Sequence, residues 1–316
     1  MRYLTVWSKE KNFISAVIYV YNAEHRIERF LQTVMEVFEE NFEHSEIICV
    51  DDCSEDDSVS CIRRTGALAK TTCVSVIHMS SFHGLELSMN AGMDLAIGDF
   101  VFEFDSTYMD YDREEIMKVY RRSLEGYDIV SASPDKKDRS TSRFFYRVFE
   151  RFTDFQGRMR TESFRILSRR VINRVSSMNK TVPYRKAIYS SCGLKTASMI
   201  YSVTATDLHM QLDAKEKRYR IGLAADSLLL FTDVGYRFSI TMTAGMMFTA
   251  ILVLAYSVVV YLTSNPVAGW TTTILFLSVA FFGLFGILTV IIKYLQLIID
   301  LIFRRKRYSF ESVEKL

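Results

Sequence analysis

Apolar residues in the first hundred positions of the chain follow two periodicities in turn. Runs of β-branched and aromatic residues predict strands over 13–20, 46–50, 74–79 and 99–104. Between these runs, apolar residues recur at helical spacing and predict helices over 26–40, 57–69 and 85–96. Strands that alternate with helices are typical of a mostly parallel sheet with right-handed crossovers, so this part is predicted to be α/β.

The pattern further along the chain is less regular. It predicts helices over 143–152 and 168–176, followed by a helix over 182–197 and a strand over 198–205. Residues 219–237 set leucine and phenylalanine among arginine and aspartate, which is typical of an amphipathic segment at a membrane surface.

A long uncharged region follows, since no Asp, Glu, Lys or Arg occurs from Phe238 to Ile292. As helices, its two apolar stretches, 240–262 and 271–292, would each span roughly 33–35 Å, enough for a hydrocarbon core of about 30 Å. A short turn around Asn265-Pro266 separates them. We predict a transmembrane hairpin, because buried helices of a soluble core rarely run this far twice without a charge.

Positive charges flank the predicted hairpin at Arg237, at Lys293 and over 304–307, which puts both ends on the cytoplasmic side. The N-terminus has no apolar run of the kind found in signal peptides. We therefore expect a multi-pass protein of the inner (plasma) membrane with both termini cytoplasmic. Its expected parts are a cytoplasmic domain (1–217), a juxtamembrane amphipathic segment (218–238), two transmembrane helices (239–292) and a basic tail (293–316).

Composition narrows the range of functions. A net charge of +2 over 316 residues gives no polyanion-binding surface, so no nucleic-acid partner is expected. The five cysteines form no C-x-x-C pair and are interpreted as reduced residues of a cytosolic domain.

Carboxylates stand where predicted strands end: Asp51 and Asp52 after the second, and Asp105 after the fourth. Ligands bind beyond the carboxyl ends of parallel strands. Carboxylates there can accept hydrogen bonds from a nucleoside, or hold a divalent cation that neutralises a diphosphate. Aspartate at a strand end is also ordinary turn and helix-cap chemistry, so these residues alone do not decide between the two interpretations.

The order and spacing of several segments are more informative about the family than any single segment. Residues 14–24 (ISAVIYVYNAE), 48–58 (ICVDDCSEDDS), 90–92 (NAG), 98–99 (GD) and Asp105 resemble the motifs of family 2 glycosyltransferases of the GT-A fold. Residues 142–147, 162–171 and Tyr308 resemble those of polyprenyl-phosphate glycosyltransferases, such as dolichol-phosphate mannose synthases and bactoprenol glucosyltransferases. The resemblance implies a Rossmann-like GT-A domain followed by juxtamembrane helices and a two-helix transmembrane hairpin.

The resemblance also implies site residues. Those expected to bind a nucleotide-sugar are Tyr19, Tyr21, Asn22, Glu24, Val50, Asp52, Ser54, Gly84, Ser106 and Arg218. Asp105, Arg143 and Arg165 are expected to be catalytic, the arginines by gripping the acceptor phosphate or the donor diphosphate.

A divalent cation, Mg²⁺ or Mn²⁺, is the expected cofactor, with Asp105, Thr107 and Asp110 as candidate ligands. The family's D-x-D motif reads Asp105-Ser106-Thr107 here, and a neutral hydroxyl is a poorer cation ligand than a carboxylate. Three alternatives stay open: Asp110 or Glu103 completes the set, metal dependence is weak, or donor turnover is impaired.

The function implied is an inverting transfer of a sugar from a nucleotide-sugar to a polyprenyl phosphate at the cytoplasmic leaflet, for cell-envelope glycan modification. One alternative is a family 2 transferase for another lipid or glycan. The other is a non-catalytic member that binds a nucleotide or a partner. Relatives with this hairpin commonly assemble, so a homo-oligomer is expected.

Overall fold

The computed structural model describes residues 8–136, 161–177, 185–204 and 310–316, together with scattered positions between 215 and 298. The chain divides into two compact units. Unit 1 comprises Met1–Arg147, Phe155–Leu223 and Lys306–Leu316, and unit 2 comprises Val148–Asp154 and Ala224–Arg305.

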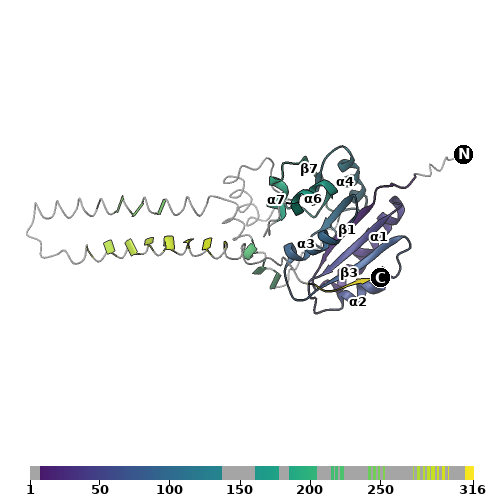
Figure 1. The fold of residues 1–316 in the computed structure, drawn as a ribbon, viewed down its shortest axis with the longest axis horizontal. Helices are drawn as coiled ribbons and strands as arrows, with labels where there is room; N and C mark the ends of the chain where they lie inside the picture. The colour runs from purple at the N-terminus through teal and green to yellow at the C-terminus, as the bar shows by residue number, and fades with distance from the viewer. Residues whose placement is uncertain are drawn as a thin grey trace, which may run out of the picture. The chain divides into compact units, whose positions relative to one another are not determined.

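The described part of unit 1 is a sheet with helices on both faces (Figure 1). The strands are β1 (Ile14–Val20), β2 (Ser45–Asp51), β3 (Thr72–Met79), β4 (Phe100–Phe104), β5 (Ile129–Pro134), β6 (Phe164–Ser168), β7 (Thr196–Tyr201) and β8 (Phe310–Lys315). The helices are α1 (Glu24–Asn41), α2 (Ser58–Gly66), α3 (Leu85–Leu95), α4 (Glu114–Leu124), α6 (Arg169–Ser177) and α7 (Arg185–Ser191).

The eight strands are ordered β7-β5-β6-β4-β1-β2-β3-β8. Strands β3, β2, β1 and β4 are parallel neighbours, whereas β6 runs antiparallel between β4 and β5, and β8 runs antiparallel to β3. All seven residues of β1 are buried, as expected for a central parallel strand covered on both faces. The predicted α/β class and its parallel core are confirmed.

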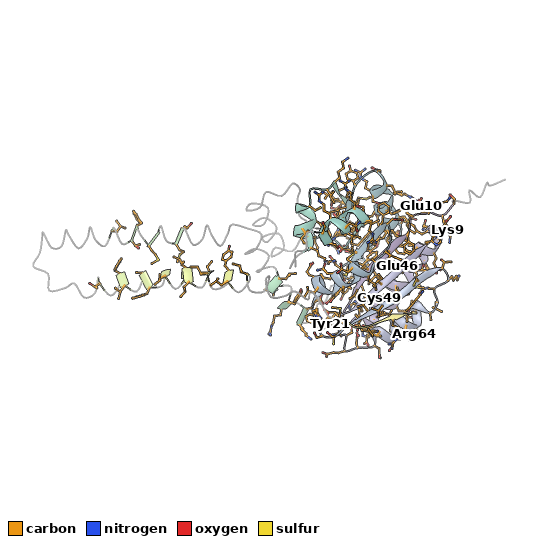
Figure 2. The ribbon with its side chains drawn as sticks, in the orientation of Figure 1. Lys9, Glu10, Tyr21, Glu46, Cys49 and Arg64 are labelled. Carbon is orange, nitrogen blue, oxygen red and sulfur yellow. The ribbon has the colours of Figure 1, made fainter. Side chains whose placement is uncertain are left out.

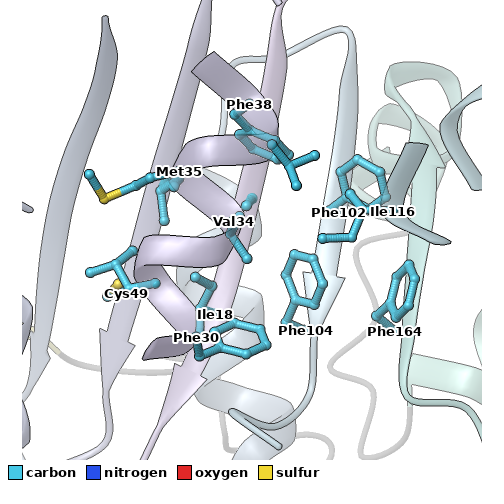
Figure 3. Close-up of a cluster of buried hydrophobic side chains, with 14 of the residues drawn as sticks. Ile18, Phe30, Val34, Met35, Phe38, Cys49, Phe102, Phe104, Ile116 and Phe164 are labelled. Atoms are coloured by element: carbon cyan, nitrogen blue, oxygen red, sulfur yellow. The ribbon is translucent and has the colours of Figure 1, made fainter. Parts of the chain in front are cut away.

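Successive residues of a strand point to opposite faces, and the sheet therefore has two cores. On one face, α1 packs Phe30 and Phe38 against Phe102 and Phe104 of β4 (Figure 3). On the other face, α3 packs against Val17 and Val50. Gly92 permits this close approach, since a Cβ at that position would overlap Val17.

The predicted strands and helices of the first hundred residues agree with the structure to within a few residues at their ends. Further on, the helix predicted over 182–197 is wrong in its extent. Helix α7 ends at Ser191, Gly193 follows with φ +67°, and β7 begins at Thr196. A glycine in this left-handed conformation breaks a helix, and the pattern of apolar residues does not reveal it. The helix predicted over 143–152 lies outside the described residues.

Strand β8 was not predicted at all. Its side chains are mostly polar (FESVEK), and it joins the edge of β3 through backbone pairing. Leu316 then contacts Val74 of β3 and Gly66 of α2, in the core that also contains α1. The last residues of the chain are thus part of unit 1.

In unit 2, every described position between 241 and 298 is helical. Gly283 lies directly against Met246, and Gly286 lies near Met242, so the two apolar stretches contact each other within the unit. Among the described positions, no helix is long and apolar enough to cross a membrane. Most of the predicted spans, 240–262 and 271–292, lies outside the described residues.

Candidate functional site

The carboxyl ends of β1, β2 and β4 meet at one edge of the sheet. Val20 pairs with Asp51 across β1 and β2, and Ile18 pairs with Phe104 across β1 and β4. Tyr21, which is labelled in Figure 2, therefore follows β1 at the edge where Asp105 follows β4. The strand-end residues singled out in the sequence therefore lie along one edge of the sheet.

Asp52 holds the loop after β3 against this edge. Its Oδ1 accepts a hydrogen bond from the His83 backbone N–H at 2.8 Å, and its Oδ2 accepts one from the Gly84 N–H at 2.8 Å. The Tyr19 hydroxyl donates to Oδ2 at 3.0 Å. Burial raises the pKa of Asp52, while these hydrogen bonds oppose the rise. Three predicted donor-site residues, Tyr19, Asp52 and Gly84, therefore form one network.

Three further predicted residues join the loops after β1 and β2. The Asn22 N–H donates to Ser54 Oγ at 3.1 Å. Asn22 Oδ1 accepts from the Glu55 N–H at 2.9 Å. Glu24 Oε2 accepts from the Asp57 N–H at 3.0 Å. Asn22 has φ +45°, a left-handed conformation that asparagine tolerates better than most residues. These side chains shape the edge, and Val50 is buried behind it in the core.

The described helical residues between 215 and 223 contact the loop that Asp52 holds. Phe82 contacts Tyr21 with ring centroids 4.9 Å apart and Tyr219 at 5.9 Å. Lys215 Nζ lies 4.6 Å from the Phe82 ring centroid. Gly84 has φ +80°, and a side chain there would overlap the Tyr219 ring. Arg218 belongs to the same stretch and is exposed.

A closed ring of ion pairs lies at the end of β4; we call it the arginine–carboxylate ring, made of Glu103, Asp105, Arg165 and Arg185. Arg165 donates to Glu103 at 3.1 Å and to Asp105 at 2.6 Å. Arg185 donates to Glu103 at 2.7 Å and to Asp105 at 2.6 Å. Each carboxylate therefore accepts one bond from each guanidinium group.

Strand register and a helix start build this ring. The antiparallel pairing of β4 with β6 places Arg165 directly opposite Glu103. Glu103 and Asp105 share a face because they are two residues apart on an extended chain. Arg185 arrives from the first residue of α7.

Four more groups surround the ring. Arg185 Nε donates to Glu86 at 2.8 Å, and Arg165 Nε lies 3.2 Å from Glu162. The Tyr189 hydroxyl donates to Glu103 at 2.7 Å, and Lys186 lies 3.6 Å from Glu162. Both arginine side chains are 3% exposed and Glu103 is fully buried, whereas Asp105 is 20% exposed. The ring therefore meets the surface through Asp105.

The ring fixes the charge of its members. Burial would raise the pKa of Asp105, but Arg165 and Arg185 outweigh it and hold that pKa well below its usual range. Burial would lower the pKa of each arginine, but the carboxylates outweigh it and raise both. Asp105, Arg165 and Arg185 are therefore charged at neutral pH.

The predicted metal ligands do not come together. Both Asp105 oxygens are bonded by guanidinium groups. The Thr107 hydroxyl is 3.5 Å from Arg26 Nε, and Asp110 Oδ1 accepts from the Tyr201 hydroxyl at 2.6 Å. Within the described residues, no three His, Cys, Asp or Glu side chains are grouped as a metal site. This arrangement does not fit a divalent cation at Asp105, because each of its two carboxylate oxygens is bonded by a guanidinium group.

Three predicted residues remain: Ser106, Glu103 and Arg143. Ser106 Oγ accepts from the Tyr108 N–H at 3.2 Å and shapes the turn after β4. Glu103, considered as a substitute ligand, instead has its two oxygens bonded by arginines and Tyr189. Arg143 lies outside the described residues.

Sequence reasoning did not find Arg185 or Glu86. Glu103 gave the available signal: a carboxylate inside the apolar strand FVFEF requires a buried positive partner. That signal does not say which arginine supplies it.

Residues 15–179 match the sequence model of the family described as glycosyl transferase family 2. The chain belongs to this family. Its mixed sheet, with β6 reversed beside a parallel core, is the scaffold of a family 2 glycosyltransferase.

Several relatives of this glycosyltransferase are known. It is 26% identical to the uncharacterized glycosyltransferase YkcC of Bacillus subtilis over 300 residues, which cover 90% of this chain and 89% of the relative. It is 28% identical to the prophage bactoprenol glucosyl transferase homolog of Escherichia coli over 194 residues, or 60% of this chain and 62% of the relative. It is 30% identical to the undecaprenyl-phosphate 4-deoxy-4-formamido-L-arabinose transferase of Aeromonas hydrophila over 131 residues, or 42% and 39%.

Among solved structures, glucosyl-3-phosphoglycerate synthase from Mycobacterium tuberculosis superposes with a TM-score of 0.51. The identity is 14%, and the match covers 69% of this chain and 78% of the other. At this identity the likeness shows the fold alone.

Proposed function

We propose that this family 2 glycosyltransferase moves a sugar from a nucleotide-sugar to a polyprenyl phosphate at the cytoplasmic face of the inner membrane. The match of residues 15–179 to glycosyl transferase family 2 carries the proposal, and Tyr21, Asp52 and Asp105 follow strands at the edge where parallel sheets bind ligands. The acceptor class is supported by relatives named for bactoprenol and undecaprenyl phosphate. Cell-envelope glycan modification is the expected use of the product.

The chemistry proposed is a single displacement. A phosphate oxygen of the acceptor attacks the anomeric carbon of the sugar as the bond from that carbon to the nucleoside diphosphate breaks. One displacement inverts the configuration, and the diphosphate leaves with the bonding electron pair. The acceptor is already an anion, so the reaction does not need a strong general base. It needs positive charge where the diphosphate leaves.

Membrane attachment through the hairpin is part of the proposal. Residues up to Leu223 and from Lys306 onward belong to unit 1, so the segment between them leaves this unit and returns to it. This supports an even number of crossings, as in the predicted pair 240–262 and 271–292. Attachment at the bilayer would confine the enzyme to the surface that holds its lipid acceptor. A homo-oligomer is proposed on the family resemblance.

The test is a transfer assay on the full chain in detergent or lipid nanodiscs. Radiolabelled UDP- and GDP-sugars are offered with undecaprenyl phosphate, with a lipid-linked saccharide or with no acceptor. We expect label in the lipid extract, together with nucleoside diphosphate release, only with undecaprenyl phosphate. Asp105→Ala should lose this transfer, and Arg113→Met, which alters an exposed ion pair, should keep it. Label only in the lipid-linked saccharide, or no release with any donor, would refute the proposal.

A further inference from the structure

We propose that Arg26 is a phosphate-binding residue of the donor site, where its guanidinium group contacts the diphosphate of the nucleotide-sugar. This inference rests on the nucleotide-sugar donor of the proposed function. It adds a residue that lies outside the sequence motifs of the site. The chemistry is a set of charge-assisted hydrogen bonds from a planar cation to phosphate oxygens.

The first step is the position of Arg26, which joins the loops that follow two neighbouring strands. It lies in the first turn of α1, just after the loop that follows β1. Its Nη2 donates to the Asn22 backbone carbonyl at 3.3 Å, and its Nε lies 3.5 Å from the Thr107 hydroxyl in the loop after β4. Its guanidinium carbon lies 4.2 Å from the centroid of the Tyr108 ring. Strands β1 and β4 are parallel neighbours, so Arg26 stands at the carboxyl edge where such sheets bind ligands.

The second step is the charge of Arg26, which forms no ion pair with an Asp or Glu among the described residues. The carboxylates of the adjacent loops have other partners. Glu24 and Asp56 accept hydrogen bonds from backbone N–H groups. Asp110 accepts one from the Tyr201 hydroxyl. The positive charge at the edge is therefore left for a ligand to neutralise.

The third step is access. An arginine carries five N–H donors, and within the described part of the chain Arg26 uses two of them, both in long bonds to neutral groups. Arg26 is half-buried, whereas Arg165 and Arg185 are 3% exposed and bonded to carboxylates. The contact with the Tyr108 ring restricts the Arg26 side chain, so less freedom is lost when a ligand binds. A phosphate group between the ends of β1 and β4 therefore meets an accessible cation that is already held in place.

The experiment compares a nucleoside with its diphosphate, because only the diphosphate carries the group that Arg26 binds. Binding of uridine, UDP, guanosine and GDP to the full chain in detergent is measured by calorimetry, directly or by competition, with Mg²⁺ present. For the base that the wild type prefers, the ratio of diphosphate affinity to nucleoside affinity should fall by about tenfold or more in Arg26→Met. Arg26→Lys should recover part of the loss, because it keeps the charge without the planar fork.

The matched control is Arg29→Met, since Arg29 lies one turn further along α1 and is exposed. Its affinity ratio should change by less than about threefold. A smaller fall in Arg26→Met, which includes equal losses for nucleoside and diphosphate, would overturn the inference. So would a fall of the same size in Arg29→Met, or no nucleotide binding by the wild type.

A second variant covers the case in which Arg26→Met does not fold. Arg26→Gln is then measured in its place, with the same expected loss, because it also removes the positive charge. In the transfer assay, label carried to an acceptor other than polyprenyl phosphate would refute the proposed function. It would leave this inference standing, because the nucleotide-sugar donor is the same for either acceptor.

Discussion

Removing Arg185 should lower the stability of the protein much more than removing a surface arginine does. Its guanidinium group bonds the buried carboxylates of Glu86 and Glu103 and the partly exposed one of Asp105, and is itself 3% exposed. Arg185→Met keeps much of the side chain's bulk but leaves those carboxylates without one of their positive partners. Breaking a buried pair by removing one partner costs about 3–5 kcal/mol, because an uncompensated charge stays buried.

The size of the effect can be stated as a melting temperature. At about 2–4 °C for each kcal/mol in a domain of this size, the expected loss is roughly 6–20 °C. Arg113→Met is the control, since Arg113 pairs with Glu36 and Glu40 on the surface and its side chain is 44% exposed. Each exposed ion pair contributes about 0.2–1 kcal/mol, so the loss of both should shift the control by no more than about 8 °C.

The assay is thermal unfolding of the full chain in one detergent, with both variants and the wild type scanned at the same rate. A common scan rate is needed because unfolding of such proteins is often irreversible. If Arg185→Met melts no lower than Arg113→Met, the ring does not stabilise the native state and the reasoning above is wrong.

Two other predictions concern Gly84 and Asp105. Gly84→Ala should lower the melting temperature, because the residue has φ +80° and its Cβ would overlap Tyr219. The double variant Gly84→Ala/Tyr219→Ala should recover only the part of the loss that comes from this overlap. An unchanged melting temperature in Gly84→Ala would contradict the contact. Asp105 has a folded pKa below its unfolded value, so its stabilisation is fully present above the unfolded pKa of about 4 and is lost as pH falls below it. The gap in melting temperature between wild type and Asp105→Asn should be constant from pH 5 to 8 and shrink below pH 4; a gap that does not change with pH would refute the assignment.

The parallel core could be predicted from sequence because its signals are local. Strand β1 is an unbroken apolar run, and α1 repeats its apolar residues at helical spacing, so each element is recognisable without its neighbours. The shared face of Glu103 and Asp105 follows from the alternation of a strand. The edge at which Tyr21 and Asp105 meet follows from the rule for parallel sheets.

The arginine–carboxylate ring could not be predicted in the same way. It depends on the register of β4 with β6 and on the place where α7 begins, and both are set by contacts between distant parts of the chain. The substitution at Thr107 was visible in the sequence, but the arginines beside Asp105 were not. Strand β8 escaped for another reason: it pairs through its backbone, so its polar side chains carry no apolar signal.

The position of β8 also sets the order in which the protein can be completed during synthesis. Strand β3 is an edge strand until residues 310–315 pair with it, and these residues are synthesised long after β3. Throughout translation of the preceding segment, the nascent sheet therefore keeps an open edge, the kind of surface on which strands from other chains assemble. Pairing of β8 with β3 closes this edge, with Glu314 bonded to Arg63 of α2 at 2.8 Å. A truncated product would lack that closure even with every residue of the arginine–carboxylate ring in place.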